Sequence, residues 1–408
     1  MKQQIIRNIP AVLTLLAPLA FFACNDPVFY TISQEVRAKD ARIKGTPTNI
    51  VYFDGFVYVA SNALFRYGGS SGSPQWTSIL PPEGKKINHL AATKNYLYML
   101  CSSDSGAGST SLYRLGPAPL AGWDWEPVGH GEPAESGYPS LFSIHADSAQ
   151  ESERLFVGAW NGNGESSSLA NYAIFWVDET TNSLKLLVKE VGALSGAAWN
   201  GSAYFHFLST GTGIYATTEP PFTASVVSNS ADIIFPGIIQ LKPGGQTVAV
   251  DREGYIYTVT AAGISYAITL SGTKSERARI GYRATGALAT YKRPGVSDTE
   301  LLLVGIQGDS GSSNYGYREI NLVSGDLPAS IISYFPGSSG PSGSSRISSI
   351  TDGNSSRYES TLGDRPVYYL YQTPENVDDL MTLFAATATD GLFSYREREE
   401  GWHWNAEE

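Results

Sequence analysis

The stretch FDGFVYVASNALFRY, from Phe53 to Tyr67, decides the fold of this chain. It begins with a tight turn at Asp54 and Gly55, continues as an apolar strand, turns again and ends as an aromatic strand. An Asp-Gly pair between apolar runs is typical of a two-residue hairpin. Branched and aromatic residues favour strands because they pack well on a pleated surface. The stretch therefore predicts two neighbouring antiparallel strands.

The same unit returns along the chain at a spacing of roughly 40 to 50 residues, which is typical of repeat architectures. Further copies lie at Thr93–Leu115, Leu155–Val177, Trp199–Thr218, Pro243–Val259, Leu301–Leu322 and Leu380–Glu397. Strands are expected before these cores at Ile87–Ala92, Ser140–His145, Ala287–Tyr291 and Ile347–Thr351. Strands are expected after them at Trp76–Leu80, Trp123–Val128, Leu184–Val191 and Ser330–Phe335.

Repeated four-stranded units of this kind predict an all-β fold, a β-propeller of seven blades over residues 47–408. A sheet that is apolar on both faces cannot bury itself, and radial packing covers each face with a neighbouring blade. The composition agrees, since 42% of residues are apolar, 12% are aromatic and no long run has a helical apolar period.

The N-terminus has the pattern of an export signal. Lys2 and Arg7 precede the apolar run Ile9–Phe22, which is short for a membrane span, and Ala23 and Cys24 follow. We expect residues 1–23 to be a cleaved signal peptide and residues 24–46 to be a tether. The alternating segment Val28–Val36 is either a strand that closes the ring or part of that tether.

The Ala23-Cys24 junction resembles the bacterial lipobox, with Phe21 where leucine is usual, as in spirochaete-type lipoproteins. The resemblance implies that Cys24 carries a diacylglycerol and fatty acids such as palmitate, and that the protein is anchored in the cell envelope. The outer membrane, the periplasmic face and the cell surface all remain open. The alternative is an ordinary secretory signal cut near Ala23. Cys101, at the end of an apolar run, is expected to be a buried thiol.

The charge balance restricts the class of partner. The chain has a formal net charge of −11, and removal of residues 1–23 takes away two basic residues and no acidic one, leaving −13. Nucleic acids are polyanions that need a positive patch, so we expect no nucleic-acid partner. We expect a monomer that reaches the membrane through its N-terminal lipid.

Short motifs do not favour catalysis or a metal. GDSGS at Gly308–Ser312 copies the surroundings of a trypsin-like nucleophile, but the chain has no matching histidine motif. The five histidines lack metal-ligand spacing, and the loop at Asn161–Ser168 has too few carboxylates for calcium. We therefore expect no cofactor and no metal.

Two tryptophan pairs are candidates for stacking. Trp123 and Trp125, and Trp402 and Trp404, lie two apart and therefore face one side of a strand. Such a pair either packs against the next blade or forms a platform for a sugar ring. Fragments at Val177–Leu184 and Ile320–Leu327 approach the blade motif of outer-membrane assembly propellers only in part.

Loop length gives the functional hypothesis. Long loops at Ser102–Thr110, Asn161–Asn171 and Gly308–Gly316 are predicted on one face, with mostly tight turns on the other. Either insertions drifted there neutrally, or the face binds a partner. The candidate ligand-binding residues are Asp104, Trp160, Asn161, Asn163, Glu165, Asp309 and Tyr315. The predicted function is a non-catalytic scaffold or adhesin-like lipoprotein that binds a protein or glycan. The alternative is an exported propeller hydrolase acting on glycans or esters.

The lipid assignment can be tested with the two cysteines of the chain. Replacing Cys24 with alanine should abolish incorporation of an alkyne-tagged palmitate, because the acyl chains have no other attachment residue. The matched variant Cys101→Ala should keep the label, because Cys101 lies in a predicted apolar strand. In-gel fluorescence of the tagged protein measures both. Equal label in Cys24→Ala and the parent chain contradicts the assignment.

Overall fold

A computed structural model describes the following residues of the chain. These are 43–61, 63–68, 75–79, 81–82, 85–103, 110–117, 124–146, 154–162, 171–199, 203–209, 213–218, 222–227, 233–242, 245–260, 263–266, 283–292, 300–307, 316–327, 333–334, 362, 365–377, 379, 381–388, 390–398 and 401–407. The described strands all belong to residues 41–408, which form one unit.

The strands group into sheets in chain order. The first three sheets hold β1 (Ile50–Phe53), β2 (Phe56–Ser61), β3 (Ala63–Tyr67) and β4 (Trp76–Ile79); β5 (Lys85–Ala92), β6 (Leu97–Ser103), β7 (Thr110–Leu115) and β8 (Glu126–Pro127); and β9 (Ser140–Ala146), β10 (Leu155–Trp160), β11 (Tyr172–Asp178) and β12 (Ser183–Lys189). The next two hold β13 (Leu194–Trp199), β14 (Tyr204–Leu208), β15 (Ile214–Thr217) and β16 (Ala224–Val226); and β17 (Gly237–Gln240), β18 (Thr247–Val250), β19 (Ile256–Thr260) and β20 (Gly263–Tyr266). The last two hold β21 (Arg283–Lys292), β22 (Glu300–Gln307), β23 (Gly316–Leu322) and β24 (Ser333–Tyr334); and β25 (Val367–Gln372), β26 (Leu383–Thr387), β27 (Leu392–Arg398) and β28 (Gly401–Ala406).

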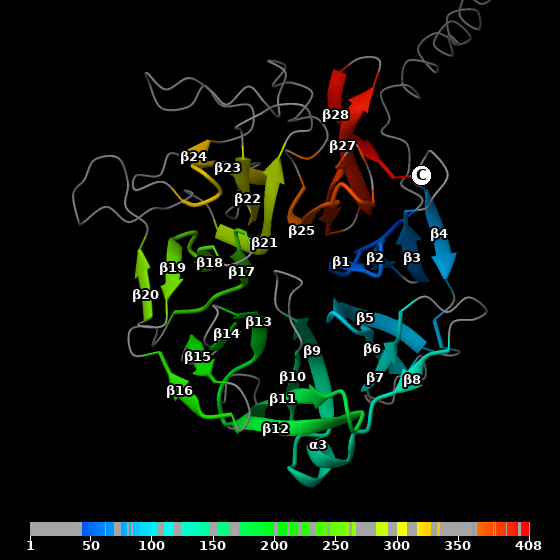
Figure 1. Ribbon diagram of the computed structural model, residues 1–408, viewed down its shortest axis with the longest axis vertical. Coiled ribbons are helices and arrows are strands. Elements are labelled where there is room, and N and C mark those ends of the chain that lie inside the picture. Colours follow the sequence, from blue (N-terminus) through cyan, green and yellow to red (C-terminus); the bar gives the residue numbers. More distant parts are fainter. Residues whose placement is uncertain are drawn as a thin grey trace, which may run out of the picture. The chain divides into compact units, whose positions relative to one another are not determined.

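These seven four-stranded antiparallel sheets are the blades of a ring, numbered one to seven in chain order (Figure 1). The predicted seven-bladed propeller is therefore confirmed. Within the described residues the one labelled helix is the short α3 (Gly131–Glu135), between β8 and β9. No helix in that part of the chain is long and apolar enough to cross a membrane.

Core packing links each blade to the next. Tyr98 and Leu100 of β6, for example, share a buried cluster with Leu155 and Val157 of β10. Cys101 lies on β6, is fully buried and is a free thiol, as predicted from its apolar surroundings. Burial raises the pKa of the Cys101 thiol to about 12, which keeps it protonated and unreactive.

Turns between third and fourth strands also join neighbouring blades. In blade three, Glu179 accepts hydrogen bonds from the Thr93 hydroxyl (2.8 Å), the Asn95 amide (2.9 Å) and the Tyr98 hydroxyl (3.0 Å) of blade two. In blade six, Asp326 takes the corresponding place and accepts from Lys242 Nζ of blade five at 2.8 Å. The sequence fragments Val177–Leu184 and Ile320–Leu327 are thus interblade connectors.

Blades seven and one close the ring. The rings of Tyr67 and Trp76 in blade one and of Phe384 in blade seven have centroids 5.0 to 5.2 Å apart. Beside them, Trp76 Nε1 donates to Glu407 Oε2 at 2.8 Å, and Ser394 donates to the other oxygen of that buried carboxylate. The chain just before β1 contributes as well, since Leu392 N donates to the Ile43 carbonyl at 3.2 Å.

Two strands predicted for the closing region of the ring are not found at their predicted places among the described residues. The first strand of the last blade is β25, Val367–Gln372, so the prediction of Ile347–Thr351 for that position was wrong. Blade seven holds four strands within residues 367–406, and the proposed closing segment Val28–Val36 lies outside the described residues.

Close backbone contact between inner strands requires glycine at two positions. Gly286 has φ +101°, and a Cβ built on it would lie 2.4 Å from the Pro236 carbonyl oxygen of the neighbouring blade. A Cβ on Gly237 would lie 2.2 Å from the Gly286 carbonyl oxygen. Backbone of blades five and six therefore meets without room for a side chain.

Gly286→Ala should destabilise the ring more than an alanine at a glycine with open surroundings. Gly137 is the matched control, because it also has positive φ, +85°, but nothing lies within 4 Å of its Cβ position. The Gly286 variant should lose about 1 to 3 kcal/mol more unfolding free energy, the usual effect of overpacking. Urea unfolding followed by tryptophan fluorescence measures both. Equal losses of unfolding free energy in the two variants would mean that the close contact between blades five and six does not contribute to stability.

Candidate functional site

A cavity of about 710 Å³ lies where the first strands of all seven blades meet. Residues from β1, β5, β9, β13, β17, β21 and β25 line it, and the centre of the ring in Figure 1 marks its place. This volume is in the range of small-molecule binding sites. It is the candidate functional site of the described chain.

The strands around this cavity are irregular. Register shifts interrupt the pairing of β5, β9, β13, β21 and β25 with the second strand of each blade. A bulge adds a residue to one strand, bends it and redirects a side chain, and bulges are common beside functional sites. Ser195 and Thr285 lie at two of these shifts, and both form hydrogen bonds to the next blade.

Polar side chains on the cavity wall connect neighbouring blades. Ser195 Oγ donates to the Phe235 carbonyl at 2.5 Å, and Thr285 Oγ1 donates to the Val367 carbonyl at 2.5 Å. The side chain of Asn49 accepts from Leu90 N at 2.8 Å and donates to the Leu90 carbonyl.

Gln372 makes a comparable pair with the main chain of the previous blade. Its Oε1 accepts from Lys292 N at 2.8 Å, and its Nε2 donates to the Lys292 carbonyl at 2.7 Å. Asn49, Ser195, Thr285 and Gln372 thus bind backbone groups on neighbouring blades and hold the wall in one shape.

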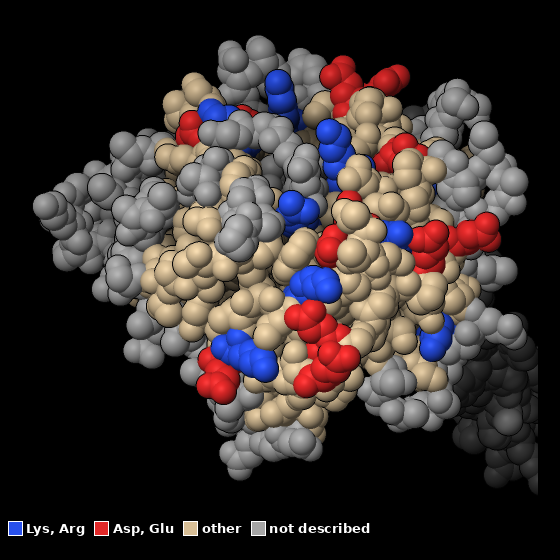
Figure 2. Space-filling view, turned by 60° about the horizontal axis from the view of Figure 1, so that its bottom comes forward, with Lys and Arg blue, Asp and Glu red and all other residues tan. Residues whose placement is uncertain are grey.

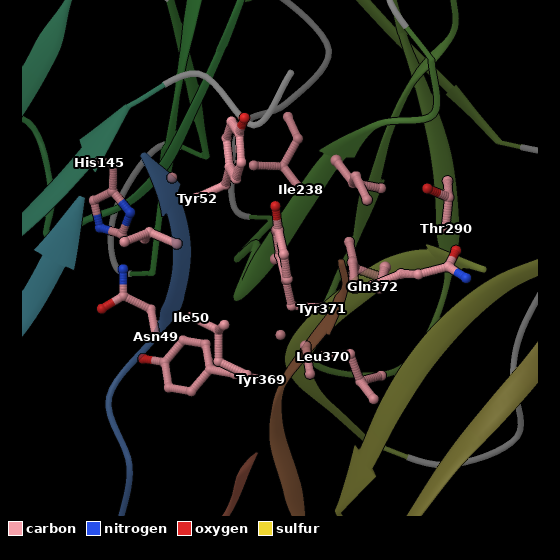
Figure 3. A pocket seen from close by; sticks show the side chains of 18 of the residues that line it. Asn49, Ile50, Tyr52, His145, Ile238, Thr290, Tyr369, Leu370, Tyr371 and Gln372 are labelled. Carbon is pink, nitrogen blue, oxygen red and sulfur yellow. The ribbon is translucent and has the colours of Figure 1, made fainter. Parts of the chain in front are cut away.

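One side of the cavity is aromatic. Tyr52 of β1 and Tyr369 and Tyr371 of β25 all line the cavity and pack against the same buried cluster; we call them the tyrosine wall. Figure 3 shows their rings around Ile50, with His145 and Asn49 nearby and Gln372 and Thr290 farther along. Asn376 Nδ2 donates to the Tyr52 hydroxyl at 2.9 Å and fixes that ring.

Two neutral histidines also line the cavity. Burial lowers the pKa of His145 to about 3, and nearby His89 lowers it further while a hydrogen bond to the Leu194 backbone opposes the shift. Burial likewise lowers the pKa of His89. Both rings are therefore uncharged at neutral pH. No group of three or more His, Cys, Asp or Glu that could hold a metal ion occurs in the described part of the chain.

The predicted ligand-binding residues lie elsewhere, as far as they are described. Trp160 ends β10, where it pairs with Tyr172 and Ser140. Asn161 follows and donates through Nδ2 to Asn171 Oδ1 at 3.0 Å, while its backbone N donates to the Asn171 carbonyl. These two bonds close the base of the long loop of blade three. Neither Trp160 nor Asn161 is among the residues that line the cavity.

The other predicted residues lie outside the described part of the chain. They are Cys24, Asp104, Asn163, Glu165, Asp309 and Tyr315, together with the GDSGS motif at 308–312. Of the tryptophans proposed for stacking, Trp404 is buried against Tyr317 of blade six, with ring centroids 5.8 Å apart. Trp125 is partly buried against a core cluster. These two rings match the packing interpretation, and Trp123 and the side chain of Trp402 lie outside the described part of the chain.

Sequence reasoning missed the cavity residues, including the tyrosine wall. The signal available was position, because the first strand of each propeller blade borders the central axis. The strand predicted at Ile347–Thr351 for the last blade leaves out Tyr369 and Tyr371, which lie on β25. Figure 2 shows basic and acidic side chains interspersed on the visible surface.

Comparison with known proteins gives neither a family nor an activity for this chain. No family model and no curated protein matches this chain. Among solved structures, the extracellular domain of BT4673 from B. thetaiotaomicron is 12% identical with a TM-score of 0.47, covering 87% of this chain and 39% of that one. This chain therefore spans about two fifths of that domain's length.

Two further structures have similar scores. BBS1N, from its complex with ARL6DN, is 12% identical with a TM-score of 0.46, over 91% of this chain and 96% of that chain. A chain of the mitotic checkpoint complex is 13% identical with a TM-score of 0.48, over 88% and 93% respectively. None of these similarities assigns a ligand or a reaction to this protein.

Buried neutral histidines predict a loss of stability in acid. His206 is fully buried, its Nε2 lies 2.7 Å from Thr217 Oγ1, and burial lowers its pKa from 6.5 to about 3. Below pH 6.5 His206 binds a proton in the unfolded chain but stays neutral in the folded chain. The free energy of unfolding therefore falls as the pH falls towards 3.

His206→Gln removes this proton uptake. Between about pH 6 and pH 4, the unfolding free energy of the parent should fall more steeply than that of the variant, by about 1.4 kcal/mol per pH unit. Urea unfolding across that range gives both slopes, and the carboxylates common to both proteins cancel in the difference. Identical slopes would show that His206 is protonated in the folded protein.

Proposed function

We propose that this protein is a lipid-anchored lipoprotein of the cell envelope whose propeller binds a protein or glycan partner without catalysis. One observation carries the proposal. The polar side chains of the cavity wall are engaged with backbone groups of neighbouring blades, as in the bonds of Ser195 and Thr285. These interblade bonds fix the blades relative to one another, so the ring presents its loops from preorganised positions, which lowers the cost of ordering on binding.

The histidines of the cavity also support binding rather than hydrolysis. A general base needs a pKa near the working pH, whereas burial holds the pKa of His145 near 3. The ring of His145 hydrogen-bonds the Leu194 backbone, where a hydrolytic triad would place a carboxylate. The exported hydrolase acting on glycans or esters is the alternative that the experiment below examines.

The partner-binding face is the one that carries the long loops. The Asn161–Asn171 bonds close the base of one of these loops, so the rigid sheet presents it from a fixed position. The lipid on Cys24 would hold this face in the envelope. Envelope location follows from the export signal and from the resemblance to the lipobox.

Shortening the loops at 102–110, 161–171 and 308–316 to two-residue turns should abolish capture of cross-linked partners from envelope extracts. The fold should persist, because the entropy of loop closure changes slowly with length. Asp54→Asn, in an exposed tight turn, is the control and should capture as the parent does. Quantitative mass spectrometry of the cross-linked material measures capture.

Two outcomes oppose the proposal. In the first, capture survives loop shortening but is lost after changes in the tight turns. That result would place partner binding on the face with the tight turns. Turnover of an ester or glycan by the parent chain, lost in Ser310→Ala, favours the hydrolase and overturns the non-catalytic role.

A further inference from the structure

The central cavity has no net charge. Among the described residues that line it, only Lys292 and Glu300 are charged at neutral pH, because burial lowers the pKa values of His89 and His145. Lys292 and Glu300 are directly opposed in the pairing of β21 with β22, so their charges offset each other. An ionised ligand would lose hydration here and meet both charges side by side, so the attraction of one is offset by the repulsion of the other. The lining therefore favours an uncharged ligand.

The tyrosine wall offers flat apolar surface. Tyr369 and Tyr371 lie two apart on β25, and Tyr52 lies on β1 of the neighbouring blade. All three are partly buried, pack on the core and line the cavity. Tyrosine combines a large ring face with a hydrogen-bonding hydroxyl at its edge. A ligand that fits this wall has an apolar face and polar groups around its rim.

Directed polar groups lie around the same space. The Tyr52 hydroxyl accepts from Asn376 and keeps its own proton to donate. A purely apolar ligand would cover that hydroxyl without accepting a hydrogen bond from it, which is costly in a buried site. The ligand must therefore bring hydroxyl or amide groups of its own.

From this combination, we propose that the central cavity binds an uncharged saccharide of one to a few pyranose rings, one ring stacked on the tyrosine wall. A pyranose has an apolar C–H face and hydroxyls at its edge, which match the rings and the polar groups respectively. The cavity volume of about 710 Å³ is suitable for a ligand of this size. The inference goes beyond the proposed function, since the saccharide site is the central cavity and the proposed partner-binding face is the one with the long loops.

Isothermal titration calorimetry of the mature full chain with neutral oligosaccharides tests the proposal. The probes are maltotriose, cellotriose and tri-N-acetylchitotriose, with trigalacturonate as the acidic counterpart and a neutral tripeptide as the peptide counterpart. At least one neutral trisaccharide should bind, and trigalacturonate should bind at least about tenfold more weakly, because Glu300 offsets the charge of Lys292, the one cation among the described lining residues.

Variants connect the binding to the wall. Tyr371→Ala should weaken saccharide binding by roughly tenfold or more, whereas Tyr371→Phe should keep most of it because the ring face remains. Tyr215→Ala is the control: Tyr215 lies on the third strand of blade four, is partly buried like Tyr371, and is not among the lining residues. Its affinity should equal that of the parent. Circular dichroism confirms that each variant is folded.

The possible failures are separable. Three outcomes overturn the saccharide assignment: no affinity for any neutral saccharide, a preference for trigalacturonate, and a preference for the tripeptide. The envelope binding role would still be decided by the cross-linking test. Equal affinity of Tyr371→Ala and the parent places the sugar outside the cavity and also overturns the saccharide assignment. Conversion of the bound sugar, seen by chromatography of the titrated solution, supports the ligand class but overturns the non-catalytic role.

Discussion

The structure depends on one constraint, that every blade is apolar on both faces and is buried only if both neighbours are present. Clusters that span two blades, such as Tyr98 and Leu100 with Leu155 and Val157, make up the core of the described residues, so the core lies between blades. Closure between blades seven and one is therefore as necessary as any internal contact. The triad of Tyr67, Trp76 and Phe384 supplies it with aromatic burial on the outer side of the ring.

The same constraint accounts for the cavity. Seven blades brought together at one axis leave a space between their first strands. Polar residues that line this space form hydrogen bonds to the backbone of the neighbouring blade and so keep it open. Asn49 and Gln372 each pair with the main chain of a neighbouring strand as another strand would. Polar groups at the axis thus stabilise the ring and shape the site together. Tyr52, Tyr369 and Tyr371 line the same space and pack against one buried cluster.

Much of the fold could be predicted from the sequence, because a turn-strand-turn-strand unit such as Phe53–Tyr67 is local and recurs. The last blade shows the limit. Ile347–Thr351 has an acceptable strand pattern, yet the partner of β26 is Val367–Gln372, and this pairing depends on tertiary register rather than local preference. The cavity was beyond sequence reasoning for the same reason. Ser195 and Thr285 resemble turn or surface residues until the ring places them beside the next blade.

The bond between Trp76 and Glu407 has a consequence for how the chain reaches this state. Its two residues are 331 positions apart, so the contact that joins the first blade to the last forms only when β28 has been made and has docked. Contacts of such large sequence separation form late, because the entropy of a long loop is lost before they stabilise anything. Until then blades one and seven each expose an apolar face. The half-made ring is thus an open-ended stack, susceptible to association with other copies, and completion of the circle ends that period.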